Sequence, residues 1–259
     1  MSHSPHLHAA LDAAEAAGQL IRKAFRGNFS VDYKADASPV TEVDVAAENV
    51  IRGRLTARFP SYGFYGEETG RSAMDAEYLW LVDPIDGTKA FVRGYPVFSV
   101  QIALMHRGEL VLGVSSAPCW NDGRGELAYA EKGQGAHVDG HGVRVADTAS
   151  LARATLSTGN LGRLASSPAW GNLGGLIPRL HRIRGYGDFL HYHYLASGKV
   201  DAVVESDVNI LDIAALTVIV REAGGVFTDL RGNPVGLETT SVLAAVPGLH
   251  AQLLETIGY

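Results

Sequence analysis

The 259-residue chain has little cysteine, no excess of positive charge and no long apolar run. Its single cysteine, Cys119, cannot form an internal disulfide or supply several thiolates to a metal, which favours a reducing compartment. Lys and Arg number 22 against 28 Asp and Glu, so the net charge is −6. A positive field that holds nucleic acid or an anionic membrane is therefore missing, and we expect neither as a partner.

No apolar stretch reaches the roughly 20 residues that a membrane-spanning helix needs. Runs such as residues 97–105 are typical of buried strands instead. Residues 1–8 show no basic segment followed by an apolar core, so we expect no secretion signal. These absences predict a cytoplasmic protein.

The composition that remains, 46% hydrophobic and 19% charged residues, is that of a compact protein. A helix is expected over residues 7–25, and a second one between Thr41 and Phe59, because apolar residues recur there at helical spacing. Short apolar runs separated by glycine-bearing turns follow, which is the pattern of an antiparallel meander. These runs are residues 79–82, 97–105, 110–116, 126–130 and 143–145.

The second half of the chain alternates strands and helices, which indicates a layered α/β arrangement. Strands are expected at residues 154–157, 182–184, 202–205, 226–229 and 242–246, and helices at 189–197, 213–223 and from 249 onward. A segment broken by Gly and Pro precedes residue 182. No flexible linker separates residues 1–148 from residues 149–259, so the two halves should pack rigidly and share any site.

The strongest local motif runs from Trp80 to Thr88, where an apolar strand leads into Asp83 and Asp86. Pro84 is expected to end the strand, and Gly87 allows a tight turn, so both carboxylates can face one point. Gly87 and Thr88 would then open the next turn or helix, whose free N–H groups suit an anion. A cation site and a phosphate site would be neighbours.

Two further acids can join this pair: Glu67, after an aromatic run, and Asp212, at the start of the helix expected at 213–223. Two carboxylates about 4 Å apart repel by about 4 kcal/mol at an effective dielectric constant of 20. Such a cluster is tolerable around cations or with raised pKa values. Because these motifs contain oxygen ligands and no Cys or His, they select a hard ion such as Mg²⁺.

Three separated motifs carry a resemblance to a known family. Gly66-Glu67-Glu68, the motif at residues 83–88, and residues 211–215 followed by 222–225 resemble the inositol monophosphatase superfamily of Mg²⁺-dependent, lithium-sensitive phosphatases. Residues 88–89, 91–94 and 184–189 are most similar to its bacterial histidinol-phosphate phosphatases. The resemblance implies an α/β (α+β) fold, a layered α/β/α/β sandwich of the inositol monophosphatase and fructose-1,6-bisphosphatase type. It also implies a homodimer with the site between the two halves.

The resemblance also implies the roles of individual residues. Two or three Mg²⁺ ions would be held by Glu67, Asp83, the Ile85 carbonyl, Asp86 and Asp212. The catalytic group would be Thr88, Asp44 and Glu67, with Thr88 and Asp44 orienting and deprotonating the attacking water. Substrate contacts would come from Asp86, Gly87, Thr88, Asp188 and Glu205, with Asp188 facing the amine of histidinol phosphate, and Lys34 would lie in a mobile loop. Since no activated Ser or Cys motif is present, metal-activated water should attack directly.

Simpler structural roles stay open for several of these residues. Asp83 and Asp86 fit a strand-ending turn, and Asp44, Thr88, Asp188 and Asp212 each fit a helix cap. Glu205 could pair with a neighbouring cation, and His191 and His193 suggest packing with partial exposure. Leu211 stands where the family usually has Trp, and Ala90 where Asn is common, which leaves the wall of the substrate pocket open.

These observations predict a Mg²⁺-dependent phosphate monoester hydrolase that acts on L-histidinol phosphate. The alternatives are an inositol-1-monophosphatase or a broad sugar-phosphate and nucleotide phosphatase. A non-catalytic homologue that binds metal or phosphosugar is the competing class. The complete set of Glu67, Asp83, Asp86, Thr88 and Asp212 argues against that class.

Overall fold

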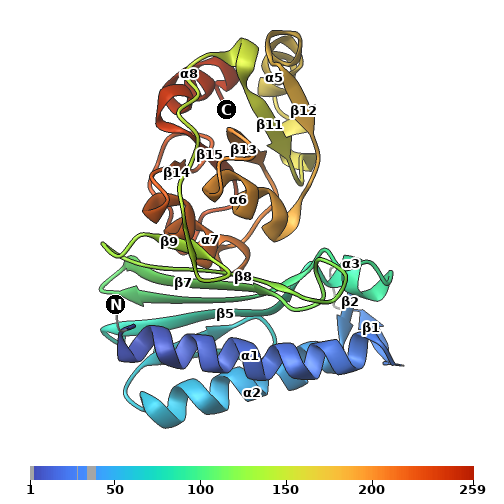
Figure 1. Cartoon of the computed structure of the whole chain (residues 1–259), viewed down its shortest axis with the longest axis vertical. Coiled ribbons are helices and arrows are strands. Elements are labelled where there is room, and N and C mark those ends of the chain that lie inside the picture. The colour runs from blue at the N-terminus through green and yellow to red at the C-terminus, as the bar shows by residue number, and fades with distance from the viewer. Residues whose placement is uncertain (1–2, 28, 34–38) are drawn as a thin grey trace.

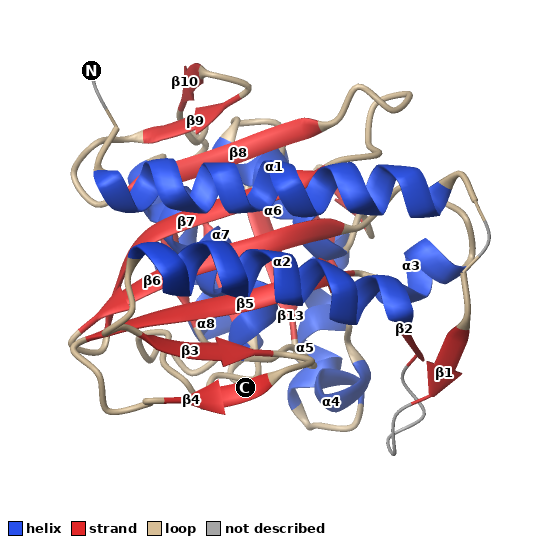
Figure 2. Cartoon of the chain, turned by 90° about the horizontal axis from the view of Figure 1, so that it is seen from below, coloured by secondary structure: helices blue, strands red, loops and turns tan. Residues whose placement is uncertain are grey.

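The computed structural model describes residues 3–27, 29–33 and 39–259, and its N-terminal layer is a pair of helices (Figure 1). Helix α1 (Pro5–Phe25) begins where the Ser4 hydroxyl accepts the Leu7 N–H, and α2 (Glu42–Arg58) begins at a capping box formed by Thr41 and Asp44. Both helices run side by side across one face of a sheet (Figure 2). The two predicted N-terminal helices are confirmed.

The first sheet has eight strands in the order β10-β9-β8-β7-β6-β5-β3-β4. Strands β5 to β10 form an antiparallel meander, as the glycine-bearing turns predict, although β9 was not among the expected strands, and β3 pairs parallel to β5. The strands are β3 (Gly63–Gly66), β4 (Gly70–Ser72), β5 (Tyr78–Asp86), β6 (Ser99–His106), β7 (Glu109–Ala117), β8 (Glu126–Glu131), β9 (Ala136–Val138) and β10 (His141–Val143). A separate small ribbon joins β1 (Val31–Tyr33) to β2 (Pro39–Thr41).

Helices α6 (Asp188–Ala196) and α7 (Ile210–Glu222) form the middle layer between the two sheets (Figure 1). Helix α7 is buried on nearly all sides and packs on β7. The approach is so close that a Cβ atom at Gly113 would lie 2.2 Å from the Ala215 carbonyl oxygen. A glycine at position 113 is therefore a requirement of this packing.

The second sheet has five strands in the order β12-β11-β13-β15-β14. Its strands are β11 (Thr155–Thr158), β12 (Arg182–Arg184), β13 (Ala202–Glu205), β14 (Val226–Thr228) and β15 (Val242–Ala245). The remaining helices are α3 (Thr88–Val92), η1 (Leu151–Arg153), α4 (Gly162–Ala165), α5 (Ala169–Leu176), η2 (Ile177–Arg179) and α8 (Pro247–Ile257). Since α5 and α8 pack together beyond this sheet, they add a helical layer to the predicted sandwich (Figure 1).

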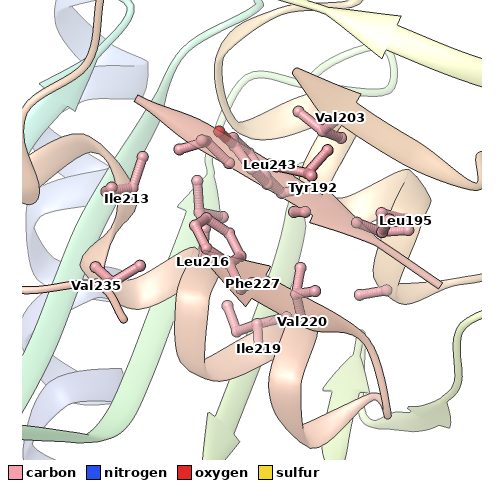
Figure 3. Packing of buried hydrophobic residues seen from close by; sticks show 14 of the residues in the cluster. Tyr192, Leu195, Val203, Ile213, Leu216, Ile219, Val220, Phe227, Val235 and Leu243 are labelled. Atoms are coloured by element: carbon pink, nitrogen blue, oxygen red, sulfur yellow. The ribbon is translucent and has the colours of Figure 1, made fainter. Parts of the chain in front are cut away.

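The hydrophobic core has two parts, one on each face of the first sheet. The part that joins the two sheets is centred on α7, whose Leu216 lies beside Phe227 and Leu243 of the second sheet (Figure 3). Within the described residues, no helix is both long and apolar enough to cross a bilayer.

Several expected boundaries were wrong. Pro84 does not end its strand, because β5 continues to Asp86 through a register irregularity. The last strand of the meander is His141–Val143 rather than 143–145, and α7 starts three residues earlier than expected. The Gly- and Pro-rich segment before residue 182 contains the short helices α4 and α5.

Candidate active site

Three aspartates from the two sequence halves converge at the end of β5. Carboxylate oxygens of Asp83, Asp86 and Asp212 lie within 4.8 Å of one another. In a regular strand, residues three apart face opposite sides of the sheet. The irregularity between Asp83 and Asp86 changes this alternation, so that both side chains can reach the same point. The convergence expected from the motif is therefore present, and it comes from a distorted strand.

The negative charges of this cluster repel one another. Burial raises the pKa of Asp83 well above its ordinary value, and repulsion from Glu67 and Asp86 adds to the rise. Burial and the charges of Asp188 and Asp212 do the same to the pKa of Asp86. Burial also raises the pKa of Asp212 to about 7, although hydrogen bonds from Asn209 counteract it. All of the donor atoms are carboxylate oxygens, and a bound cation would relieve the repulsion between them. The cluster therefore fits a hard divalent cation.

A first prediction concerns the stability of the metal-free protein. The folded-state pKa of Asp212 lies near 7, above the ordinary 3.8, so this group stabilises the fold at low pH and that contribution is lost as pH rises to about 7. In excess chelator, the melting temperature of the wild type minus that of Asp212→Asn should therefore fall between about pH 5 and about pH 7. Both proteins contain the same histidines, so the effect of histidine titration on the melting temperature cancels in this difference.

Added Mg²⁺ should raise the melting temperature of the wild type at neutral pH more than that of Asp212→Asn, since a ligand that binds the folded state stabilises it. A difference that stays flat with pH, or that rises, would contradict the assigned repulsion.

Glu67 reaches the cluster from the turn after β3. Its backbone N–H donates to the Val82 carbonyl, and its side chain hydrogen-bonds Asp83. Buried Glu48 of α2 holds this turn by accepting the backbone N–H groups of Glu68 and Thr69 at 2.8 and 2.6 Å. Sequence reasoning missed Glu48, whose only signal was an acidic residue on the apolar face of the helix.

Asp44 and Thr88 lie together beside the aspartates, as expected. The Thr88 Oγ1 atom lies 3.2 Å from Asp44 Oδ1 and 3.0 Å from the Ile85 carbonyl oxygen. Asp44 Oδ2 accepts the backbone N–H of Thr41 at 2.8 Å, so Asp44 is also a helix cap. Burial raises the pKa of Asp44, while hydrogen bonds from Thr41 lower it. Asp212 likewise has two roles, because it caps α7 together with Asn209 and also belongs to the carboxylate cluster.

The two predicted specificity acids face a small cavity beside the cluster. This cavity of about 20 Å³ is lined by, among others, Asp86, Asp188, Tyr192, Glu205 and Asp212. Asp188 has a φ of +45°, a left-handed conformation that costs a non-glycine residue energy and is frequent at functional sites. Burial, followed by the charge of Glu205, raises the pKa of Asp188 to about 6. The cavity wall is thus strongly acidic.

Glu205 is almost fully buried and is held by its surroundings. Its oxygens accept the Tyr192 hydroxyl and the Asn160 backbone N–H, and Oε2 lies 3.2 Å from His191 Nε2. Burial alone would raise the pKa of Glu205, but the charge and hydrogen bond of His191, with Tyr192 and Asn160, bring it below its ordinary value. The neighbour that pairs with Glu205 is therefore His191, and the partial exposure expected for His191 and His193 was wrong, since both are buried.

The remaining predicted positions complete the rim of the site. Gly87 has a φ of +91° and precedes α3, so Thr88 opens a helix as expected. Leu211 and Ala90 are both buried. The loop residue Lys34 lies outside the described residues. Chemically, the arrangement offers three clustered carboxylates, a hydroxyl–carboxylate pair and an acidic cavity.

Comparisons with known proteins agree with this geometry. The model of the inositol monophosphatase family matches residues 2–258. A histidinol-phosphatase from Mycobacterium tuberculosis is 40% identical, covering 98% of each chain. An inositol-1-monophosphatase from Mesorhizobium japonicum is 32% identical, covering 99% of this chain and 97% of the relative. The structure of an IMPase from Thermotoga maritima has a TM-score of 0.86 at 30% identity, covering 98% and 97%. The resemblance and the sandwich fold are confirmed, and the chain belongs to the inositol monophosphatase family.

Proposed function

We propose that this chain hydrolyses L-histidinol phosphate to L-histidinol and phosphate, with two or three Mg²⁺ ions. Its family acts on small phosphorylated substrates, so the chain is a phosphoric monoester hydrolase. The observation that carries the proposal is the mutually repelling cluster of Asp83, Asp86 and Asp212 beside an acidic cavity. Glu67 and the Ile85 carbonyl are the further oxygen donors that we assign to the ions.

The chain's own residues supply positioning and proton transfer. A water held by the Thr88 hydroxyl would pass its proton through that hydroxyl to Asp44 Oδ1, 3.2 Å away. The raised pKa of Asp44 makes it a stronger base than an ordinary aspartate. The backbone N–H groups of Gly87 and Thr88 would hold the phosphate, and Asp86 would help to orient it. Bound Mg²⁺ would supply the positive charge that acidifies water and neutralises the phosphoryl oxygens.

The acidic cavity supports a cationic leaving group. The charges of Asp188 and Glu205 raise the pKa of Asp86, and the charge of Glu205 raises that of Asp188, so a protonated amine would relieve this repulsion. Because Glu205 is engaged by three protein groups, Asp188 is the better direct partner for the amine. The histidinol-phosphatase from Mycobacterium tuberculosis, at 40% identity, supports the same choice.

The second candidate function is inositol-1-monophosphatase, which the relative from Mesorhizobium japonicum at 32% identity favours. A broad phosphatase for sugar phosphates and nucleotides on the same scaffold is a further alternative. A non-catalytic homologue is disfavoured by the intact Asp44–Thr88 pair beside the acidic cluster. We further propose a cytoplasmic homodimer without nucleic-acid or membrane partners, in keeping with the net charge of −6.

A phosphate-release assay tests the function. Histidinol phosphate, inositol 1-phosphate, fructose 1,6-bisphosphate and 3′-phosphoadenosine 5′-phosphate are compared with Mg²⁺, with chelator and with Li⁺. The expected result is the highest kcat/KM for histidinol phosphate, with loss of release in chelator. Preference for inositol 1-phosphate would favour the second candidate. Full activity in chelator would contradict the metal site.

A further inference from the structure

A row of buried polar side chains crosses the first sheet on the face that carries α6 and α7. Gln101 of β6 pairs in register with Asp83 on one side and with Ser115 of β7 on the other. Next to this row, Ser99 pairs with Asp86. Ser99, Gln101 and Ser115 are at most 1% exposed. The phosphatase mechanism above uses none of these three side chains, yet their burial requires compensating hydrogen bonds.

Hydrogen bonds join these groups into one chain that ends on Asp86. Gln101 Nε2 lies 2.7 Å from Ser99 Oγ and 3.1 Å from Ser115 Oγ. Ser99 Oγ lies 3.5 Å from Asp86 Oδ2. At the other end, His193 Nε2 lies 2.8 Å from Ser115 Oγ, and His193 Nδ1 lies 2.7 Å from Glu126 Oε1. The chain therefore runs between two carboxylates, and Gln101 stands at its middle.

The chemistry of the amide fixes the direction of the two bonds at the centre of this chain. The Gln101 nitrogen has two hydrogens and donates one to each serine oxygen. Each serine then keeps its own single hydrogen: Ser99 gives it to Asp86 Oδ2, and Ser115 Oγ forms the hydrogen bond with His193 Nε2. His193 donates from Nδ1 to Glu126 Oε1. In agreement, this hydrogen bond lowers the pKa of Glu126, which favours the carboxylate form.

The opposite orientation of the amide is less favourable. Gln101 Oε1 is buried and has no partner within the described part of the chain. If the nitrogen occupied that place, two buried N–H hydrogens would lack acceptors in place of one carbonyl oxygen, which costs more. Both serines would also have to donate to the amide oxygen, so Asp86 would lose its hydroxyl donor.

Asp86 needs such a donor because its neighbours repel it. Asp188, Asp212, Glu205 and Glu67 all act against its charge. A carboxylate in this field would rotate away from the cluster unless one of its oxygens is held. Groups that support metal ligands by hydrogen bonds fix the orientation of those ligands and strengthen metal binding.

We propose that Gln101 is a positioning residue for Asp86: by donating to Ser99 Oγ, it turns the Ser99 hydroxyl hydrogen onto Asp86 Oδ2 and holds the carboxylate in the orientation that binds Mg²⁺. The proposal rests on the proposed function, in which Asp86 is a metal ligand. Ser115, His193 and Glu126 form the opposite arm of the chain, which takes up the second amide hydrogen and does not touch Asp86.

The test is calorimetric titration of Mg²⁺ into the metal-free protein without substrate. Gln101→Met keeps the length of the side chain and removes both donors, and Ser99→Ala removes the hydroxyl. Each should weaken Mg²⁺ binding about tenfold. The double variant should bind Mg²⁺ with about the same affinity as whichever single variant binds Mg²⁺ more weakly, because both changes break the same contact. If Gln101→Met does not fold, Ser99→Ala carries the test alone.

Ser115→Ala is the matched control, since it removes an equally buried hydroxyl that also accepts from Gln101. Its melting temperature should fall about as much as that of Ser99→Ala, while its Mg²⁺ affinity should stay within about twofold of the wild type. Equal weakening by the two alanine variants would overturn the proposal, as would unchanged affinity in Ser99→Ala and Gln101→Met. A wild-type protein that binds no Mg²⁺ would instead overturn the proposed function.

Discussion

The Asp83→Asn variant is expected to lose Mg²⁺-dependent phosphate release, with kcat/KM reduced by more than about a hundredfold. Loss of groups that merely support metal ligands costs about 10- to 100-fold in affinity or activity, and Asp83 lies in the carboxylate cluster itself. The asparagine has nearly the same volume, so the core around position 83 should not change. Phosphate release under saturating Mg²⁺ measures the effect.

The same variant should fold as well as the wild type. Burial and the neighbouring acids raise the pKa of Asp83 in the metal-free fold, so a neutral side chain removes repulsion. Without metal, the melting temperature of Asp83→Asn should therefore equal or exceed that of the wild type. Asp75→Asn, an identical change at an exposed position before β5, is the control and should keep full activity. Comparable activity of Asp83→Asn and the wild type would refute the metal site.

The second large effect is expected on substrate choice. Asp188→Asn should raise the KM for histidinol phosphate by about 10- to 100-fold, because a hydrogen bond to a charged group is worth about 1.5–3 kcal/mol. Asparagine is preferred to alanine here, since position 188 has a φ of +45° and asparagine tolerates the left-handed conformation. Steady-state kinetics on both candidate substrates provides the measurement.

The KM for inositol 1-phosphate, whose leaving group carries no positive charge, is the internal control and should change by less than about threefold. An equal rise for both substrates would mean that Asp188 shapes the cavity without recognising an amine. Unchanged values for both would remove the main reason for preferring histidinol phosphate.

Much of the fold could be predicted because its signals are local. Apolar residues at helical spacing located α1 and α2. Short apolar runs between glycine-bearing turns located β5 to β8 of the meander, but they missed β9 and placed β10 two residues too late. The pairing of β3 parallel to β5 could not be predicted, since it depends on contacts between distant segments. Pro84 misled the strand boundary because a strand can continue through a register irregularity.

In the site, too, some residues could be predicted from local motifs and others could not. Asp83, Asp86 and Asp212 could be found because motifs of known spacing carry them, and their structural and chemical roles coexist, as at Asp212, which both caps α7 and joins the cluster. Gln101 and Ser99 could not be found, since nothing local distinguishes them from other polar residues, and Glu48 was marked only by its place on the apolar face of α2. Their importance comes only from what the fold brings within hydrogen-bond distance.

The absence of a side chain at position 113 has a consequence for Asp212, which lies on a different element. Helix α7 rests directly on the backbone of β7 at this point, and Asp212 lies one turn before Ala215 on the same helix. Any larger residue at 113 would lift the helix and carry Asp212 away from its two partners on β5. A substitution can thus abolish activity at a glycine that bears no reactive group and belongs to no catalytic motif.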